Sequence, residues 1–194
     1  MADNQKFGMI LIKPDAHRDF LSEMIIRDLE AEGAQIVLRK DVAISRDQAT
    51  RIYRELAGDE KLEIAAETLS GNEKNRFATL VVVKFEGDKP AQELLVELKG
   101  KADKSGIRKK YLLHSMDELR EMNLGREETD HRLAENRIHV PDTYDESLEV
   151  INMLISEHDR RDLEEREPLL TKELIAEKRK HELTAELKPD GKMR

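Results

Sequence analysis

The strongest candidate for a reactive side chain is His139, which lies between the β-like segment Asn136-Arg137-Ile138 and the turn signal Pro141-Asp142-Thr143. An imidazole with an ordinary pKa near roughly 6.5 keeps one ring nitrogen free at neutral pH and can act as a covalent nucleophile. The alternative is a strand-end histidine that is hydrogen-bonded to the backbone. Taken alone, His139 favours that alternative.

Two further positions suit phosphate oxygens. Lys13 directly follows a short apolar run, which places its ammonium at the end of a predicted strand. Arg108 lies in a basic segment with four lysines: Lys101, Lys104, Lys109 and Lys110. Lysine offers a point charge and arginine a forked set of donors to a phosphate. A solvated basic loop is the alternative interpretation of the second feature.

Several classes of active site are excluded. The chain has no cysteine, so disulfides, thiolate nucleophiles and cysteine zinc sites are ruled out. It contains no GxxxxGK[ST], GxGxxG, HExxH or GxSxG motif. Five other histidines show no metal-ligand spacing: His17, His114, His131, His158 and His181.

Composition limits the class of protein. The 194 residues are 39% charged and 38% hydrophobic, enough for one modest core plus an extension. The net charge of -8 disfavours nucleic acid and anionic membrane as partners. The N-terminus lacks a basic segment followed by a long apolar one, and no apolar run approaches roughly 18 residues. We therefore expect a cytoplasmic protein with no membrane partner.

The hydrophobic pattern predicts alternating strands and helices. Strands are expected at Phe7–Ile12, Ala34–Ile44, Phe77–Phe85 and Asn136–Val140. Helices are expected at Arg18–Glu32, after the cap Ser45 to Leu56, in part of 59–75, at about 90–98, near 115–122 and at Asp142–Ile155. A turn at Lys13–Asp15, a basic loop at 99–110 and a charged connector before His131 complete the expected elements.

This order favours an α+β fold of the split βαβ type, with a four-stranded antiparallel sheet and helices on one face. A doubly wound sheet is the alternative, and the small number of strands weighs against it. From His158 the charge becomes dense, and Pro168 divides two predicted helical pieces. These pieces are interpreted as a solvated or partner-packing tail.

Taken together, the segments resemble nucleoside diphosphate kinases. The family's "IKPD" pattern matches Ile12–Asp15, and its second-helix tyrosine matches Tyr53. Its "GTIRGDF" loop is similar to 105–111, and its "NIIHGSDS" pattern is similar to 136–143. The matching elements follow the family's order over about residues 7–155. The chain is identified as a divergent member with an insertion at about 114–135, in a domain over 1–157, before a charged helical tail over 158–194.

The resemblance implies a ferredoxin-like fold and a role in nucleotide metabolism. ATP, as its Mg²⁺ complex, would phosphorylate His139, and a nucleoside diphosphate would then take the phosphoryl group. Lys13, Tyr53, Arg108 and Asn136 match positions that hold the phosphates and sugar. The Mg²⁺ ion would be held mainly by the nucleotide phosphates, without a protein metal site. A homo-oligomer is also implied.

The chain departs from the family pattern at several positions. Val140-Pro141 stands where the family has Gly-Ser, and Val150 aligns with the glutamate that orients the histidine ring. Glu146 and Glu149 are the candidates to replace that glutamate. Lys99 and Lys101 are the candidates for two missing phosphate ligands, and Leu62 is the apolar residue nearest the missing base-stacking aromatic.

These departures keep two other functions open. The first is a nucleotide-binding domain with little or no kinase activity that serves regulation or assembly. The second is a ferredoxin-like interaction module that binds partners through its tail.

Overall fold

The fold is built on one four-stranded sheet. The computed structural model describes residues 5–72, 74–101 and 104–186, so the last part of the predicted tail, 187–194, lies outside it. The strands are β1 (Phe7–Ile12), β2 (Gln35–Ala43), β3 (Phe77–Lys84) and β4 (Ile138–His139). They lie in the order β2-β3-β1-β4, and each neighbouring pair is antiparallel. The predicted α+β fold is confirmed, and the doubly wound alternative is wrong.

The two central strands are apolar on both faces. All of β1 is buried, and β3 is buried from Ala78 to Val83. Because alternate residues of a strand point to opposite faces, Met9 and Leu11 enter one core, while Ile10 and Ile12 enter the other. Helices therefore cover both faces, and the prediction of helices on one face is wrong. A continuous apolar run is typical of strands buried on both sides.

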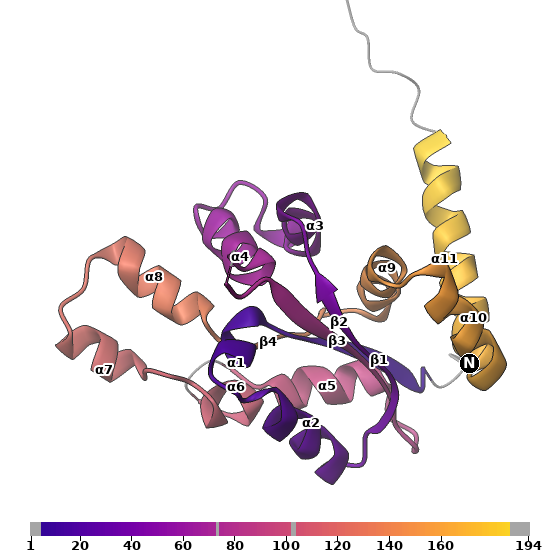
Figure 1. Cartoon of the computed structure of the whole chain (residues 1–194), viewed down its shortest axis with the longest axis horizontal. Coiled ribbons are helices and arrows are strands. Elements are labelled where there is room, and N and C mark those ends of the chain that lie inside the picture. The colour runs from indigo at the N-terminus through magenta and orange to yellow at the C-terminus, as the bar shows by residue number, and fades with distance from the viewer. Residues whose placement is uncertain (1–4, 73, 102–103, 187–194) are drawn as a thin grey trace, which may run out of the picture.

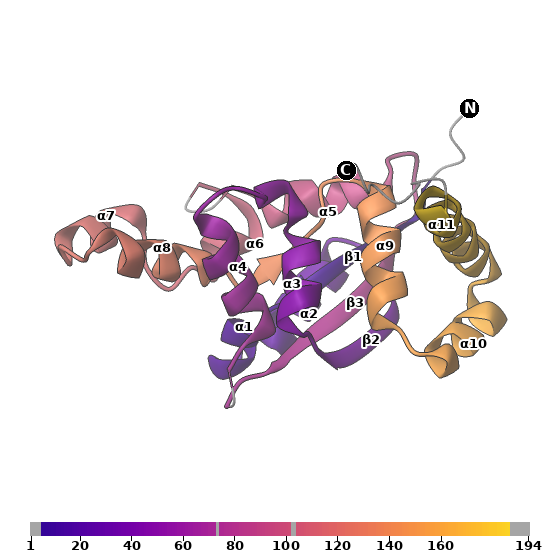
Figure 2. The ribbon, with the colours of Figure 1, turned by 90° about the horizontal axis from the view of Figure 1, so that it is seen from above.

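Two groups of helices supply these covers (Figures 1 and 2). The core that contains Ile10 is completed by α1 (Pro14–Arg18), α2 (Ser22–Ala31), α5 (Ala91–Lys99) and α6 (Gly106–Lys110). The opposite core is completed by α3 (Arg46–Ile52), α4 (Lys61–Ser70), α9 (Tyr144–Leu154), α10 (Glu157–Arg166) and α11 (Pro168–Glu186). A short 3₁₀ turn, η1 (Arg54–Leu56), lies between α3 and α4 in the chain.

Three predicted irregular segments contain helices. The predicted turn at Lys13–Asp15 is the start of α1, where Pro14 at the first helical position suits the helix. The predicted basic loop contains α6. The predicted connector before His131 contains most of α8 (Arg126–Ala134). Each helix is short and mostly polar on its surface, so hydrophobic periodicity gave little signal.

The segment predicted to be an insertion forms a helical arm. It comprises α7 (Met116–Glu121) and α8, and Figure 1 shows α7 far from the sheet while α8 leads back toward β4. Ion pairs join the arm to the body at both ends of α8. Arg126 pairs with Glu60 at 3.0 Å, and Arg18 pairs with Glu135 at 2.7 Å. The end of α8 is thereby held beside α1 and α4.

The C-terminal helices pack on the body. Pro168 separates α10 from α11, which confirms the predicted break. Leu163, Leu170 and Leu174 are fully buried in the same core as Met9 and Leu11. This part of the tail is therefore an integral cover of the sheet. Within the described residues, no helix combines the length and apolar character that a membrane crossing requires.

Candidate active site

His139 lies on an edge strand, and the pairing of that strand fixes the face of the sheet on which its side chain lies. β4 pairs with β1 so that His139 lies opposite Leu11, and directly opposed residues share one face of a sheet. The preceding Arg137 has φ 70° and is buried. Its backbone N–H donates to Asp15 Oδ2 at 3.0 Å, and its Nε donates to the Tyr111 carbonyl at 2.9 Å. This network fixes the entry to β4 and points His139 toward α3 and α9.

Gln92 fixes the exit from β4. Its Oε1 accepts from the Met9 N–H at 3.2 Å, and its Nε2 donates to the Pro141 carbonyl at 2.5 Å. This bridge requires α5 to lie against β1. Gly8 allows that approach, because a Cβ there would meet Gln92 Oε1 at 3.0 Å and Leu95 at 2.8 Å.

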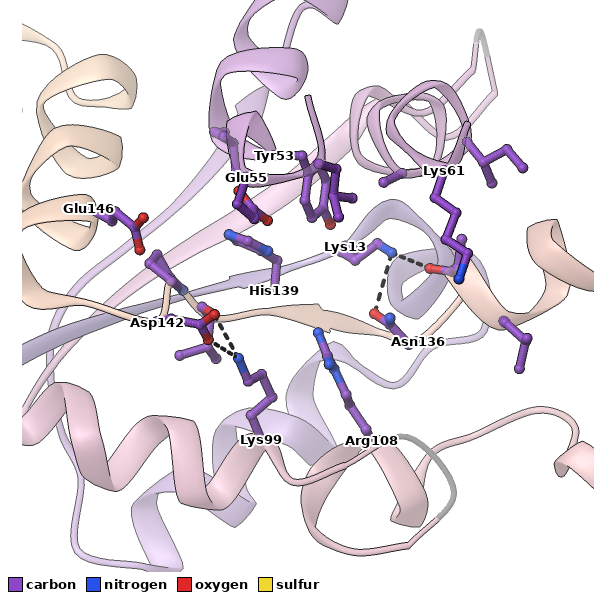
Figure 3. A pocket seen from close by; sticks show the side chains of 18 of the residues that line it. Lys13, Tyr53, Glu55, Lys61, Lys99, Arg108, Asn136, His139, Asp142 and Glu146 are labelled. Atoms are coloured by element: carbon purple, nitrogen blue, oxygen red, sulfur yellow. Dashed lines mark hydrogen bonds and ion pairs between the residues drawn. The ribbon is translucent and has the colours of Figure 1, made fainter. Parts of the chain in front are cut away.

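The predicted site residues line one pocket of about 470 Å³. Figure 3 shows their side chains converging from separate elements. Lys13 follows β1, Tyr53 ends α3, Arg108 comes from α6, and Asn136 and His139 come from the β4 segment. The fold thus brings all five predicted residues together. Their roles remain predictions.

His139 is buried, at 7% exposure, and uncharged at neutral pH. Burial lowers the pKa of its imidazole to about 3, and the nearby Arg108, Lys13 and Lys99 cations add to the shift. Tyr53 packs edge-on against it, with ring centroids 4.7 Å apart. In the described part of the chain, its ring nitrogens have no hydrogen-bond or ion-pair partner. One ring nitrogen therefore carries an available lone pair in a pocket that is lined with cations.

Lys13 is sealed inside the pocket wall at 1% exposure. Its ammonium donates to the carbonyl of Ala134, the last residue of α8, and to Asn136 Oδ1 at 3.4 Å. Burial lowers its pKa to about 8; Asp15 opposes that shift, and Arg108 adds to it. At neutral pH the group is a cation that neutral acceptors satisfy only in part.

Arg108 has unused donor capacity. Its Nη2 reaches the Ile138 carbonyl at 3.5 Å, while its Nε is buried with no hydrogen-bond partner in the described residues. Burial also lowers its pKa from the ordinary value. An unpaired buried donor on a cation is costly, and an anionic ligand in the pocket would relieve that cost.

The structure also places the candidate replacements for the missing family residues. Of the two candidate lysines, Lys99 lines the pocket and Lys101 does not; Lys99 donates to the Val140 carbonyl at 3.1 Å and to Asp142 at 2.8 Å. Leu62 does not line the pocket, whereas its neighbours Lys61 and Ile64 do. The packing of α4 against the rest of the protein decides which of its residues line the pocket, and no local sequence pattern predicts this.

Sequence reasoning missed the pocket walls that come from η1 and α8. Glu55 follows Tyr53 by two residues, and Asp130 and Leu133 belong to the inserted arm. Glu146 and Val150 line the pocket too. Glu149 lies outside the pocket lining and binds Arg54 and Arg51. The spacing of Glu55 from Tyr53 was the one available signal.

The described residues contain no group of three or more histidine or acidic side chains able to hold a metal ion. Acidic side chains do line the pocket, but they are dispersed or paired with cations. A magnesium ion in this pocket would meet single carboxylates among the described residues and would need its other ligands from a bound anion and water.

A sequence model of the family "Nucleoside diphosphate kinase" matches residues 7–159, which is most of the chain. The chain belongs to the nucleoside diphosphate kinase family. No curated protein matches it. The family match covers every strand of the sheet and ends in α10, so α11 lies beyond it.

Solved nucleoside diphosphate kinases share the fold at low identity. An enzyme from Pyrobaculum aerophilum is 20% identical, with TM-score 0.60, over 79% of this chain and 97% of that one. One from Borrelia burgdorferi, a transition-state mimic with bound vanadate and ADP, is 18% identical, with TM-score 0.59, over 78% and 88%. One from Aquifex aeolicus is 18% identical, with TM-score 0.56, over 79% and 96%.

Proposed function

We propose that this member of the nucleoside diphosphate kinase family transfers the γ-phosphate of ATP to a nucleoside diphosphate through a phosphohistidine at His139. The observation that carries the proposal is the convergence of an uncharged His139, the buried Lys13 and the half-buried Arg108 on one pocket. Phosphoryl transfer requires in-line positioning and cations around the moving charge, and little other chemistry from the protein.

The proposed first step is a displacement at phosphorus. The lone pair of one His139 ring nitrogen forms a bond to the γ-phosphorus, while the bond to the β–γ bridging oxygen breaks. Its electron pair leaves on ADP. In the second step, a terminal oxygen of a nucleoside diphosphate attacks the phosphohistidine, and the electron pair of the N–P bond returns to the imidazole. Magnesium bound to the nucleotide would neutralise phosphate charge in both steps.

The pocket residues have matching roles in this proposal. Lys13 and Arg108 bind the phosphate oxygens, and Asn136 and Tyr53 bind the phosphate and sugar. Lys99 contributes positive charge to the phosphate end, because it lies beside Val140 directly after the nucleophile. The base then extends toward the wall formed by α4 and α8, where Ile64 and Leu133 supply apolar surface.

One contact favours a second candidate, a nucleotide-binding domain with weak transfer activity. The Lys13 ammonium already donates to the Ala134 carbonyl at the end of α8. A phosphate must compete with that acceptor for the lysine. A helix C-terminus also carries partial negative charge, which opposes an incoming anion.

The deciding experiment is a phosphoenzyme assay. Incubation with γ-labelled ATP and magnesium is expected to give an acid-labile phosphoprotein, and added GDP or CDP is expected to discharge it. His139→Gln should abolish the label, while His158→Gln, at an exposed position of α10, should retain it. Label that persists in His139→Gln contradicts the proposal. Calorimetric binding of ATP without any phosphoprotein supports the second candidate.

We further propose that the protein is a homo-oligomer, which light scattering of the full chain would test. A monomeric mass at micromolar concentration would contradict this. The division into a domain over 1–157 and a tail over 158–194 also stays a proposal, as does the exclusion of nucleic acid as a partner.

A further inference from the structure

The nucleophile lacks a partner for its second ring nitrogen. His139 is buried, and no described residue hydrogen-bonds to its ring; its one recorded ring contact is the edge of Tyr53. A histidine that attacks through one nitrogen needs the other nitrogen protonated and held, since this fixes both the tautomer and the ring orientation. The question is which group near His139 is free to accept that N–H.

Four carboxylates line the pocket, and three of them are engaged elsewhere. Asp142 accepts from Lys99 at 2.8 Å. Asp130 lies 3.8 Å from Arg126 on its own helix. Glu146 accepts from the Thr143 N–H at 3.2 Å as part of the cap of α9. The fourth, Glu55, has no hydrogen bond or ion pair with another residue's side chain in the described residues, and the hydrogen bond recorded for its carboxylate comes from its own backbone N–H.

Glu55 is also placed to reach the ring. It belongs to η1, two residues after Tyr53, so the same turn that sets the Tyr53 ring against His139 positions Glu55. Figure 3 shows the Glu55 carboxylate directed at the imidazole, on the side opposite the cations Lys99 and Arg108. Its pKa is raised, first by partial burial and then by the neighbouring Glu146 and Asp142 carboxylates. The backbone N–H of Glu55 and the nearby Arg54 already oppose that rise in pKa, and a further positive charge beside the carboxylate would oppose it more.

We propose that Glu55 is the positioning residue of His139, with its carboxylate accepting the N–H of the ring nitrogen that does not attack phosphate. This inference rests on the proposed function. As the attacking nitrogen forms its bond to phosphorus, positive charge develops on the ring, and the carboxylate stabilises it while the proton stays on the second nitrogen. When the phosphoryl group leaves, the ring returns to the same neutral tautomer. Glu55 thus replaces, from a different element, the acid that is absent at Val150.

The test compares three charge-neutralising variants: Glu55→Gln, Glu146→Gln and Glu63→Gln. Glu63 lies on α4, does not line the pocket, and is the matched control. Nitrogen-15 NMR of the His139 ring reports the tautomer without any nucleotide. We expect one dominant tautomer in the wild-type protein and in Glu63→Gln. We expect Glu55→Gln to lose that dominance.

Single-turnover phosphorylation by γ-labelled ATP gives the second readout. Glu55→Gln should slow it by about 10- to 100-fold, the range found when the partner of a ligand histidine is removed. Glu55→Asp should restore part of the rate. An unchanged tautomer and rate in Glu55→Gln, or the same losses in Glu146→Gln alone, would overturn the assignment. If the wild type forms no phosphohistidine, the proposed function fails, and the tautomer measurement still tests Glu55.

Discussion

Replacing His139 with glutamine should make the protein less sensitive to acid. The imidazole is buried at 7% exposure, and its pKa is lowered from 6.5 to about 3. Below pH 6.5 the His139 imidazole is therefore protonated in the unfolded chain but stays neutral in the folded protein until the pH approaches 3. Stability from this group is complete above pH 6.5 and is lost as the pH falls toward 3. Glutamine keeps a polar planar side chain and removes the titration.

The size of the effect follows from the shift. Each pKa unit corresponds to about 1.36 kcal/mol, so lowering the pH from 7 to 5 should cost the wild-type protein about 2 kcal/mol through His139. The carboxylates titrate in both proteins, so their contribution cancels in the comparison.

Urea unfolding followed by circular dichroism at pH 7 and pH 5 measures this difference. The wild-type protein should lose about 2 kcal/mol more than His139→Gln between the two conditions. His158→Gln is the matched control, because that side chain is 84% exposed, and it should behave as the wild type does. Parallel losses in wild type and His139→Gln would refute the reasoning that His139 is held neutral by burial.

Four further outcomes are expected. Phosphohistidine formation, measured by quench flow, should fall above pH 8 as the Lys13 ammonium loses its proton, because its pKa is about 8; a flat profile to pH 9.5 would contradict this. Arg108→Gln should weaken ATP binding in calorimetry by about 1.5–3 kcal/mol, the value of a charged hydrogen bond. Leu174→Ala should lower the free energy of unfolding by about 2–5 kcal/mol, since Leu174 is fully buried. Arg18→Ala should change stability by under about 1 kcal/mol, yet speed amide exchange in α8 by releasing Glu135; unchanged exchange would show that this ion pair does not hold the arm.

The strands and long helices were predictable because their patterns are local. The run Phe77–Phe85 and the capped segment after Ser45 carry their periodicity and turn signals within about ten residues. β3 forms close to its predicted bounds, whereas the helix predicted from the Ser45 cap to Leu56 is divided into α3, which ends at Ile52, and η1. The convergence of Lys13 and His139 was predictable only through the family pattern. The two residues are 126 positions apart, and antiparallel pairing of β1 with β4 brings them together.

The rest of the site depends on packing that no local pattern encodes. Leu62 is the apolar residue nearest the position of the missing base-stacking aromatic, but the packing of α4 places Lys61 and Ile64 in the pocket lining instead. Glu149 was a candidate to orient the ring, but it binds arginines outside the pocket. The orientation of a helix about its own axis decides which of its side chains reach the pocket. A rotation of the helix by one residue position would place different side chains there.

The burial of the C-terminal helices has a consequence for synthesis. The face of β1 that carries Met9 and Leu11 is covered in part by Leu163, Leu170 and Leu174, which are translated long after β1. At about 5–20 residues per second, roughly 10–30 s separate translation of β1 from translation of Leu174. During that interval the nascent sheet presents an apolar face to solvent. This core is therefore complete only after Leu174 has been translated, and a product that stops before Leu163 exposes the surface that chaperones and proteases recognise.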